Sequence, residues 1–504
     1  MSPTSPHPRR WWALAVLSLG LLVISLDNTI LNVALPSLSD DLGATSSELQ
    51  WIVDAYLLVF AGLLLTAGSL GDRFGRKRAL TLGLFIFGAA SAASAMAQTP
   101  AALIAGRAMM GIGGALIMPS TLSIVTATFP ADERPKAIGI WAAVAGIGVA
   151  IGPVAGGWLV ENASWHWVFL VNVPFVLVAL VAGQRLIPES RDPSQSRLDA
   201  IGAAISTAGL GTLLWGIISA SDRGWGDQLV VGALILGALA LALFVWFERR
   251  TESPMLDMAV FRNPRFSASS LSITIAFFVL MGMMFFLTQY LQDVLGLSPF
   301  DAGVRMLPVA AGMVVGGPLG ARLAQRFGAK LVVASGLAFV AGAMALLAQT
   351  DVGGPYGLIA AALALMGFGM GTAMSPATDA IMGTLDERHL SVGSAMNDTT
   401  RLVGGALGVA VLGSLMTSHY GDAMQSAPAA AQDSVGAAHA VAAHLPTAAG
   451  SALDAAANAA FVDAMHMVLY VSMAILAVAV AVTLRFLPAR AQQRRLVRAE
   501  AVPA

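Results

Sequence analysis

Fourteen apolar segments, each about 20 residues long, run through the 504-residue chain. A helix needs about 20 predominantly apolar residues to cross the hydrocarbon core of a bilayer, and few soluble helices are apolar on every side. The segments comprise residues 11–35, 49–70, 79–97, 101–126, 137–160, 167–186, 200–219, 228–247, 267–290, 302–323, 331–347, 357–376, 393–417 and 465–486. The sequence therefore predicts an all-α integral membrane protein with 14 transmembrane helices.

The composition agrees with a membrane protein and argues against an enzyme. Charged residues make up 11% of the chain, whereas they make up about 25% of a typical soluble domain. The absence of cysteine excludes disulfides and thiolate metal sites, and the seven histidines show no metal-ligand spacing. The chain also lacks a Walker A string, so ATP is not the expected energy source. We expect no enzymatic activity, no cofactor, no metal and no nucleic-acid partner.

Basic residues gather on one side of the predicted helices. With the N-terminus placed in the cytoplasm, all of the 28 lysines and arginines fall inside except Arg107, Arg223, Arg305 and Arg401. Positively charged loops are retained on the cytoplasmic side of membranes. An even number of helices then leaves both termini in the cytoplasm, and the first apolar run is interpreted as a retained helix, because no cleavage site follows it.

Two loops carry related strings. Between the second and third segments the chain reads GSLGDRFGRKR at residues 68–78, and between the tenth and eleventh it reads QRFGAK at residues 325–330. The first string resembles the loop signature of the major facilitator superfamily, whose two six-helix halves are parallel repeats that rock about a central site. The two copies lie eight segments apart instead of six, so we expect segments seven and eight to be an inserted pair.

The resemblance implies three parts. We expect an N-terminal six-helix bundle at residues 1–190, the inserted pair at residues 191–262 and a C-terminal six-helix bundle at residues 263–504. In the last part, residues of about 418–463 form a long, Ala-rich connection on the outer side. The sequence leaves two alternatives for this connection, a small folded hairpin and a disordered loop.

The first loop string is expected to form a conformational gate. Its predicted residues are Gly68, Asp72, Arg73, Gly75 and Arg76. The glycines allow a tight loop to approach its neighbours, Asp72 can accept from a helix N-terminus, and Arg73 can pair with an acid. The alternative is that the basic residues only anchor the loop, but anchoring requires neither the aspartate nor the spaced glycines. Gln325 stands where Asp72 does in the second copy, which predicts a weaker contact there.

Further strings resemble the fourteen-helix drug:proton antiporter branch of that superfamily. The first segment holds LDNTILNVALP at residues 26–36, and the sixth opens with WHWVFLVNVP at residues 165–174. The fifth holds GIGVAIGPVAGG at residues 146–157, which is similar to the antiporter motif that importers of the superfamily generally lack. The resemblance covers the whole chain apart from the outer connection and the basic tail.

The predicted antiporter motif consists of Gly148, Gly152, Pro153, Gly156 and Gly157. Three of its glycines are four residues apart on one helical face, where missing side chains allow close packing, and the proline adds a kink. In the family this helix is thought to seal the bundle against leak; ordinary small-residue packing is the alternative. The tenth segment offers a possible packing partner in Gly312, Gly316, Gly317, Pro318 and Gly320.

Charged residues within the membrane need a reason, because each costs at least about 2.5 kcal/mol at mid-helix. Asp27, Asp54 and Arg107 fall toward the outer part of the bundle and are expected to share one polar cavity. Arg107, in LIAGRAMMG at residues 103–111, resembles the helix 4 arginine implicated in proton coupling in the antiporter family. We assign proton coupling to Asp27 and Arg107; a static ion pair is the alternative.

The predicted substrate contacts favour cations. The stretch QWIVDAY at residues 50–56, which holds Asp54 and Tyr56, is similar to bacterial exporters of quaternary ammonium compounds, cationic dyes and fluoroquinolones. Asp398 falls where these exporters carry an acid on helix 13. Arg401 lies three residues further on, so a structural pair with Asp398 is an equal alternative.

The ninth segment is expected to line the cavity. It is the second-half counterpart of the first segment and carries Met281, Met284 and Phe285. Methionine adapts to many shapes and aromatic rings stack on cations, which suits a substrate pocket. Lipid contact or ordinary packing is the alternative for each of these side chains.

These features predict a proton-coupled antiporter that exports drug-like, cationic lipophilic compounds. The expected partners are small organic substrates, protons and the lipid bilayer, and we expect a monomer in the bacterial inner membrane, driven by the proton gradient. The alternatives are a dedicated exporter of an endogenous antibiotic or other metabolite, and a non-transporting membrane receptor or enzyme. A membrane enzyme should show clustered histidines or acids at one membrane face, which this sequence does not.

Overall fold

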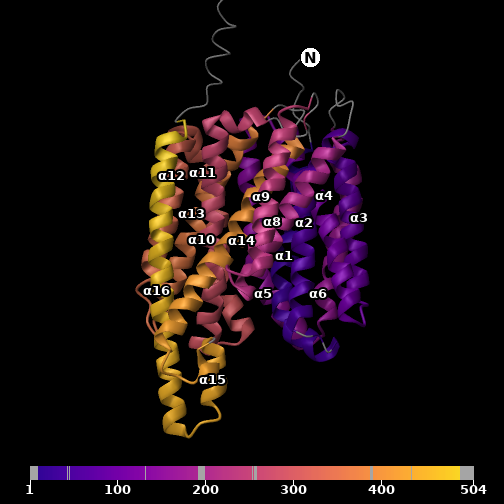
Figure 1. Ribbon diagram of the computed structural model, residues 1–504. Helices are drawn as coiled ribbons and strands as arrows, with labels where there is room; N and C mark the ends of the chain where they lie inside the picture. The colour runs from indigo at the N-terminus through magenta and orange to yellow at the C-terminus, as the bar shows by residue number, and fades with distance from the viewer. Residues whose placement is uncertain are drawn as a thin grey trace, which may run out of the picture.

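The protein is a bundle of long helices. The computed structural model describes residues 9–42, 44, 46–130, 132–190, 199–251, 254, 258–385, 390–432 and 434–488, and its regular structure there is helical. The start of α1 and the end of α16 lie at the same end of the bundle (Figure 1), which we call the termini face.

The helices fall into three groups along the chain. The first comprises α1 (Arg10–Leu42), α2 (Ser46–Phe74), α3 (Arg76–Ser94), α4 (Pro100–Thr128), α5 (Arg134–Asn162), α6 (His166–Leu170) and α7 (Asn172–Leu186). The second is the pair α8 (Ala200–Arg223) and α9 (Gln228–Glu248), followed by a 3₁₀ turn at Met258–Arg262. The third comprises α10 (Pro264–Gln289), a π-helical turn at Tyr290–Val294, α11 (Pro299–Phe327), α12 (Ala329–Leu347), α13 (Tyr356–Met382), α14 (Leu390–Ala423), a 3₁₀ turn at Ala429–Ala431, α15 (Val435–Ala442) and α16 (Thr447–Phe486).

Twelve segments of the described chain are long and apolar enough to cross a membrane. They include α6 and α7 as one segment, and every other long helix except α3 and α5. α3 opens with Arg76, Lys77 and Arg78, which lowers its mean hydropathy. The protein is thus a multi-pass helical membrane protein, with two fewer segments of this kind than the sequence predicted.

The first and third groups pack by the same plan. α1 packs on α5 and α7, and α4 on α2 and α3; correspondingly, α10 packs on α14 and α16, and α13 on α11 and α12. Each group has its own apolar core, and the two groups meet where α5 packs on α11 and α2 packs on α14. Matching helices such as α1 and α10 lie eight predicted segments apart, which is also the separation of the two related loop strings.

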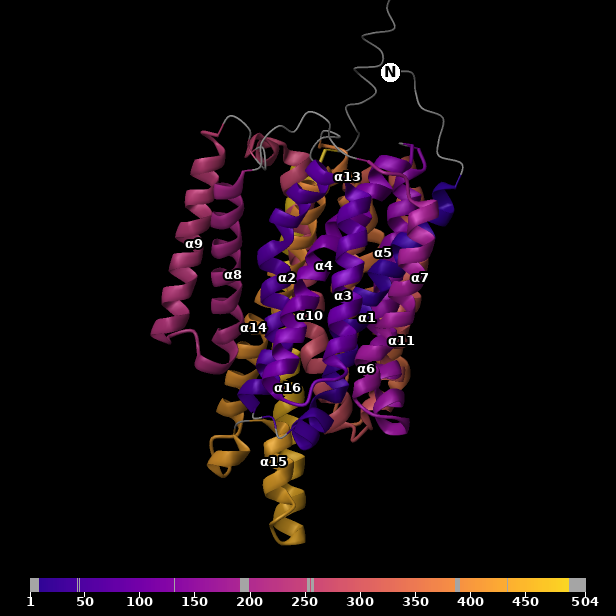
Figure 2. The ribbon, with the colours of Figure 1, turned by 90° about the vertical axis from the view of Figure 1, so that its right-hand side faces the viewer.

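The α8–α9 pair stands beside this double bundle (Figure 2). α8 packs on α2 and α14, and α9 packs on α8. Thr66 and Thr207 share a hydrogen bond of 3.0 Å, and Trp225 Nε1 donates to Ser414 Oγ at 2.9 Å, so the pair contacts both halves.

The long outer connection is largely helical. α14 continues to Ala423 and α16 begins at Thr447, whereas the sequence suggested a helix ending near residue 417 and another beginning near residue 465. Alanine has the highest helix propensity, so this Ala-rich stretch forms helices although it is too polar to read as a membrane span. α15 packs on α16, and both extend beyond the rest of the bundle (Figure 1) as a folded hairpin.

The sixth predicted segment contains a break. α6 ends at Leu170 and α7 begins at Asn172, where the sequence suggested one continuous helix. Pro174 has no N–H for the Leu170 carbonyl, and its ring would clash with that carbonyl in a regular helix. The break turns Asn172 into the interior of the first half, where it is fully buried.

Candidate functional site

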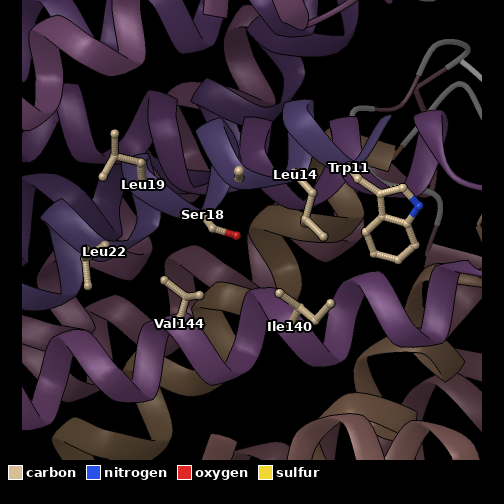
Figure 3. Close-up of a pocket in the computed structure, with 8 residues that line it drawn as sticks. Trp11, Leu14, Ser18, Leu19, Leu22, Ile140 and Val144 are labelled. Carbon is tan, nitrogen blue, oxygen red and sulfur yellow. The ribbon is translucent and has the colours of Figure 1, made fainter. Parts of the chain in front are cut away.

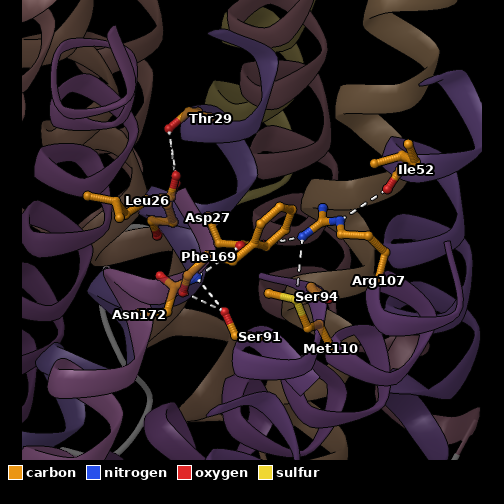
Figure 4. A network of polar contacts seen from close by, with 11 residues as sticks. Leu26, Asp27, Thr29, Ile52, Ser91, Ser94, Arg107, Met110, Phe169 and Asn172 are labelled. Carbon is orange, nitrogen blue, oxygen red and sulfur yellow. Dashed lines mark hydrogen bonds and ion pairs between the residues drawn. The ribbon is translucent and has the colours of Figure 1, made fainter. Parts of the chain in front are cut away.

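Asp27 of α1 and Arg107 of α4 form an ion pair inside the first half (Figure 4). Arg107 Nη1 lies 2.6 Å from Asp27 Oδ2, and each side chain is only 1% exposed. A buried charge is tolerated when an opposite charge and further hydrogen bonds compensate its lost solvation. The structure therefore brings together the two residues that the sequence assigned to proton coupling.

Asn172 binds the second oxygen of the Asp27 carboxylate. Its Nδ2 donates to Asp27 Oδ1 at 3.1 Å and to Ser91 Oγ at 3.2 Å, and Ser91 Oγ donates to the Phe169 carbonyl at 2.8 Å. Sequence reasoning missed Asn172 and Ser91. The available signal was the VNVP string of residues 171–174, in which the proline breaks the helix and so brings the asparagine inward.

Arg107 is also held by α2. Its Nε donates to the Ile52 carbonyl at 3.0 Å, and its guanidinium lies 4.4 Å from the centre of the Tyr56 ring. Gly111 makes this approach possible, because a Cβ there would lie 2.7 Å from the Tyr56 carbonyl oxygen. Tyr56, expected to contact substrate, therefore lies buried against the ion pair.

The hydrogen bonds of this network depend on the charge of Asp27. As a carboxylate, Asp27 accepts from Arg107 and Asn172; once protonated, it loses its charge and becomes a donor. Asn172 Oδ1 is buried with no hydrogen-bond partner among the described residues, so a turn of the amide would let it accept from the protonated acid. Residues of α1, α2, α4 and α7 all contribute to this network.

Asp54 lies on another side of α2. It is half-buried and stands two residues before Tyr56, which places the two side chains about 200° apart around the helix. Tyr56 faces Arg107, so Asp54 does not share that face of α2. Of the residues expected to share one cavity, Asp27 and Arg107 thus lie together, packed with Tyr56, while Asp54 lies on another face of α2.

A second buried pair lies on α14. Asp398 Oδ1 is 3.9 Å from Arg401 Nη1, and the Arg401 guanidinium lies 4.9 Å from the Trp141 ring of α5 and 5.5 Å from the Phe277 ring of α10. Asp398 Oδ2 and Arg401 Nε and Nη2 are buried without hydrogen-bond partners among the described residues. The Asp398–Arg401 pair, which the sequence left as one of two alternatives, is present. These atoms without partners lie where the two halves meet.

The expected pocket side chains of α10 lie at different depths. Met281 packs against Gly405 and Phe285 against Gly413, both on α14. Met284 is half-buried, whereas Phe285 is 46% exposed. These three side chains therefore do not form one enclosed wall in this conformation.

The predicted gate lies at the turn between α2 and α3. Asp72 Oδ1 accepts from Arg76 Nη2 at 2.7 Å, and Asp72 Oδ2 accepts from the Val392 backbone N–H at 3.2 Å, in the first turn of α14. A helix N-terminus favours a carboxylate, so this contact joins the two halves. Arg76 is a basic partner of Asp72, and the Arg73 guanidinium lies 5.1 Å from the Phe74 ring.

Glycines shape this turn. Gly68 is buried in the last turns of α2, and Gly75 has a φ of 112°, a conformation that a residue with a Cβ rarely adopts. A Cβ at Gly75 would also lie 2.6 Å from Glu189 Oε1. Glycine is therefore required at Gly75, between the end of α2 and the start of α3.

The second loop string makes the matching contact. Gln325 Nε2, near the end of α11, donates to the Asp132 carbonyl at 3.1 Å, just before α5. A neutral amide–carbonyl bond is weaker than a hydrogen bond to a carboxylate. Both loops thus contact the opposite half at the termini face, and the contact through Gln325 involves no charged group.

The glycines of α5 pack against α1. A Cβ at Gly148 would lie 2.7 Å from Ser25 Cβ, one at Gly152 would overlap Thr29 Oγ1, and one at Gly156 would lie 2.8 Å from the Ile30 carbonyl oxygen. Pro153 lies within α5, and a Cβ at Gly157 would be 3.4 Å from Phe300, in ordinary contact.

The packing partner suggested for these glycines is correct only in part, because α5 packs on α11 but Gly148, Gly152 and Gly156 face α1. Gly312, Gly316 and Gly320 of α11 face α13, and only Gly317 meets α5, at Gly139. Residues four apart share a helix face, while Gly317 lies about 100° around from Gly316. α5 therefore uses one set of glycines against α1 and another against α11.

The chain resembles transport and resistance proteins along most of its length. It is 37% identical to "Multidrug efflux pump LfrA" of Mycolicibacterium smegmatis over 91% of this chain and 93% of that protein. It is 35% identical to "Methyl viologen resistance protein SmvA" of Salmonella typhimurium over 96% of this chain and 100% of that protein. It is 36% identical to "Tetracenomycin C resistance and export protein" of Streptomyces glaucescens over 82% of this chain and 77% of that protein.

The fold also matches solved structures. The proton:xylose symporter XylE of the major facilitator superfamily aligns over 96% of this chain and 97% of its own with a TM-score of 0.62 and 14% sequence identity. A bacterial homologue of the human lysosomal transporter Spinster aligns over 97% of this chain and 100% of its own with a TM-score of 0.58 and 18% identity. Residues 17–409 match the family model described as "Major Facilitator Superfamily". The chain belongs to the major facilitator superfamily.

Proposed function

We propose that the protein is a proton-coupled antiporter that exports drug-like compounds, with lipophilic cations as its main substrates. The buried network of Asp27, Arg107 and Asn172 carries the proposal, because it is a protonatable group whose charge state changes contacts among four helices. Ionisable groups at such depth in a membrane are expensive and are retained for ion or proton pathways.

The names of the relatives support export of foreign compounds. LfrA is named a multidrug efflux pump, and SmvA is named for resistance to methyl viologen, a permanently charged aromatic cation. A dedicated natural-product exporter is the second candidate, since another relative is named for export of tetracenomycin C. The half-buried Asp54 and the buried Asp398 favour cations over that candidate.

The proposed topology has fourteen spans in a monomer of the bacterial inner membrane. α3, with 19 residues, and α5, with 29, run within the bundle (Figure 2) and pack on α4 and on α1 and α11. Counted with the twelve other segments, they give two six-helix halves and the inserted pair α8–α9. The positive-inside rule then places the termini face in the cytoplasm.

On this topology the structure is closed toward the cytoplasm. Asp72 with Val392, Gln325 with Asp132, and Ser375 Oγ with the Pro135 carbonyl all join the halves near the termini face. Substrate release to the outside would follow from this state, and opening toward the cytoplasm requires these contacts to break.

Resistance and dye efflux in a bacterium lacking its own pumps would test the proposal. We expect resistance to ethidium and other quaternary ammonium compounds, and loss of ethidium efflux when a protonophore collapses the proton gradient. Efflux that survives the protonophore while ATP is present would refute proton coupling. Resistance confined to one neutral or anionic antibiotic would favour the dedicated exporter.

Replacing Asp54 by Asn should separate cationic from neutral substrates. The substitution keeps the shape of a half-buried side chain and removes its charge, so resistance to cationic dyes should fall about tenfold relative to a neutral substrate, equivalent to about 1.4 kcal/mol of lost attraction. Minimum inhibitory concentrations for matched cationic and neutral compounds provide the measurement. The exposed Asp301 provides the control, since Asp301→Asn should leave both unchanged. Equal losses for both substrate classes at Asp54→Asn would remove its cation role.

Replacing Asp72 by Ala should destabilise the closed termini face. A hydrogen bond to a charged group contributes about 1.5–3 kcal/mol, so the equilibrium between the two conformations should shift about 10- to 100-fold toward opening. Distance measurements between labels on the α2–α3 turn and the start of α14 would detect the shift. Gln325→Ala removes the neutral counterpart and should shift the equilibrium less. A gate role is ruled out if Asp72→Ala impairs dye binding while the distances stay unchanged.

A further inference from the structure

α1 and α5 enclose a groove near the termini face (Figure 3). Its volume is about 410 Å³, and it is lined by Trp11, Leu14, Ala15, Ser18, Leu19, Leu22, Ile140 and Val144. The hydroxyl of Ser18 and the indole N–H of Trp11 are the polar side-chain groups in this lining. The groove takes no part in the network around Asp27.

The two helices are held together at both ends of the groove. Toward the middle of the bundle, Gly148 brings α5 against Leu22 and Ser25. At the termini face, Arg10 Nε and Nη2 donate to the two carboxylate oxygens of Glu133 at 2.6 and 2.8 Å. The space between these contacts is therefore a defined cavity between fixed ends.

The groove opens toward lipid and away from the proton site. Ser18 and Asp27 are nine residues apart on α1, which places them about 180° apart around the helix. On α5, Val144 lies on the same stripe as Ile151 and Trp158, at intervals of seven residues, and both of those side chains are exposed. Ala15, on the groove's edge, is exposed as well.

The Ser18 hydroxyl indicates that the groove binds a ligand. Its hydroxyl is buried without a hydrogen-bond partner among the described residues, and Figure 3 shows the oxygen directed into the space between the helices. A buried hydroxyl with no partner costs free energy, so a group that can hydrogen-bond would be favoured beside it. The rest of the lining favours a long apolar chain.

The rim carries more positive than negative charge. Arg9, Arg10, Arg134 and Lys136 lie at the ends of α1 and α5, against Asp132 and Glu133. Glu133 is already engaged by Arg10, and Lys136 Nζ lies 4.9 Å from the Trp11 ring at the mouth of the groove. Basic pockets between helices at this depth suit anionic lipid headgroups and repel a cationic substrate.

We propose that this groove binds one anionic phospholipid, with an acyl chain against Ile140 and Val144, an ester oxygen at Ser18 and the phosphate beside Lys136. The lipid comes from the leaflet at the termini face, which is the cytoplasmic leaflet on the proposed topology. It fills the space between α1 and α5 and so maintains the angle at which their glycine contacts form. The site is independent of the transported compound, so its test does not depend on the proposed function.

Lipid binding to the purified full-length protein tests the site. After delipidation, native mass spectrometry would follow titration with phosphatidylglycerol or phosphatidylcholine. We expect one phosphatidylglycerol to bind to the wild type more tightly than any phosphatidylcholine. Val144→Trp, which fills the groove, should weaken that event at least tenfold, and Ser18→Leu provides a second filling variant from the opposite helix. Lys136→Gln should weaken it about fivefold.

Two matched controls separate this site from general lipid contact. Leu236→Trp introduces the same side chain at an exposed position on α9, and Lys330→Gln removes a charge at the start of α12; both should leave the binding unchanged. Wild-type phosphatidylglycerol binding in folded Val144→Trp and Ser18→Leu would overturn the proposal. Equal phosphatidylcholine binding that is insensitive to Lys136→Gln would also overturn it, as would displacement of the lipid by ethidium at the groove.

Discussion

Asp27→Asn is expected to reduce the export of every substrate at least about 100-fold. The substitution leaves the Arg107 charge buried without its carboxylate, and breaking one side of a buried pair costs about 3–5 kcal/mol. It also removes the group that exchanges the coupling proton. Initial rates of dye efflux at several pH values provide the measurement, and we expect the remaining activity to lose its pH dependence.

A double variant separates coupling from stability. Asp27→Asn combined with Arg107→Gln removes both charges, so the folded yield should recover toward the wild type because no buried charge is left unpaired. Export should stay absent in this variant if Asp27 carries the proton. Recovery of pH-dependent export in the double variant would show that the pair is only structural.

Gly156→Ala is expected to be severely damaging, whereas the same change one residue later should be tolerated. A Cβ at Gly156 would lie 2.8 Å from the Ile30 backbone carbonyl oxygen, which cannot move unless α1 moves. Overpacking of this kind costs about 1–3 kcal/mol. At Gly157 the added methyl would be in ordinary contact with Phe300, and alanine is about 1 kcal/mol better than glycine within a helix.

Thermal unfolding in detergent and proton leak in liposomes would measure this difference. Gly156→Ala should lower the midpoint of unfolding and increase leak, because α5 no longer seats on α1. Gly157→Ala should match or exceed the wild-type midpoint. Indistinguishable behaviour of the two variants would contradict the close packing of α1 and α5 described here.

The sequence predicted the apolar helices well because each span needs a long run of apolar residues. Their ends were less predictable. α14 and α16 continue beyond the apolar core as Ala-rich helices, which hydropathy alone does not reveal. The break before Asn172 depends on the steric effect of Pro174, which a count of apolar residues ignores.

Contacts between helices were predictable only in part. The pairing of Asp27 with Arg107 followed from the high cost of isolated charges in a membrane, since each needs a partner. The partner of the α5 glycines followed only in part, because a small-residue face shows that a helix packs closely but not against which neighbour. The partner of Asp72 depended on which of two nearby arginines the turn at Gly75 brings close.

Counting protons against substrate in a purified system would test the central claim most directly. The protein would be reconstituted into liposomes that contain a pH-sensitive dye, and substrate would be added without any nucleotide. The account predicts that ethidium moves in one direction as protons move in the other, and that both fluxes disappear together in Asp27→Asn. Ethidium transport without proton movement, or proton-coupled transport that persists in Asp27→Asn, would contradict it.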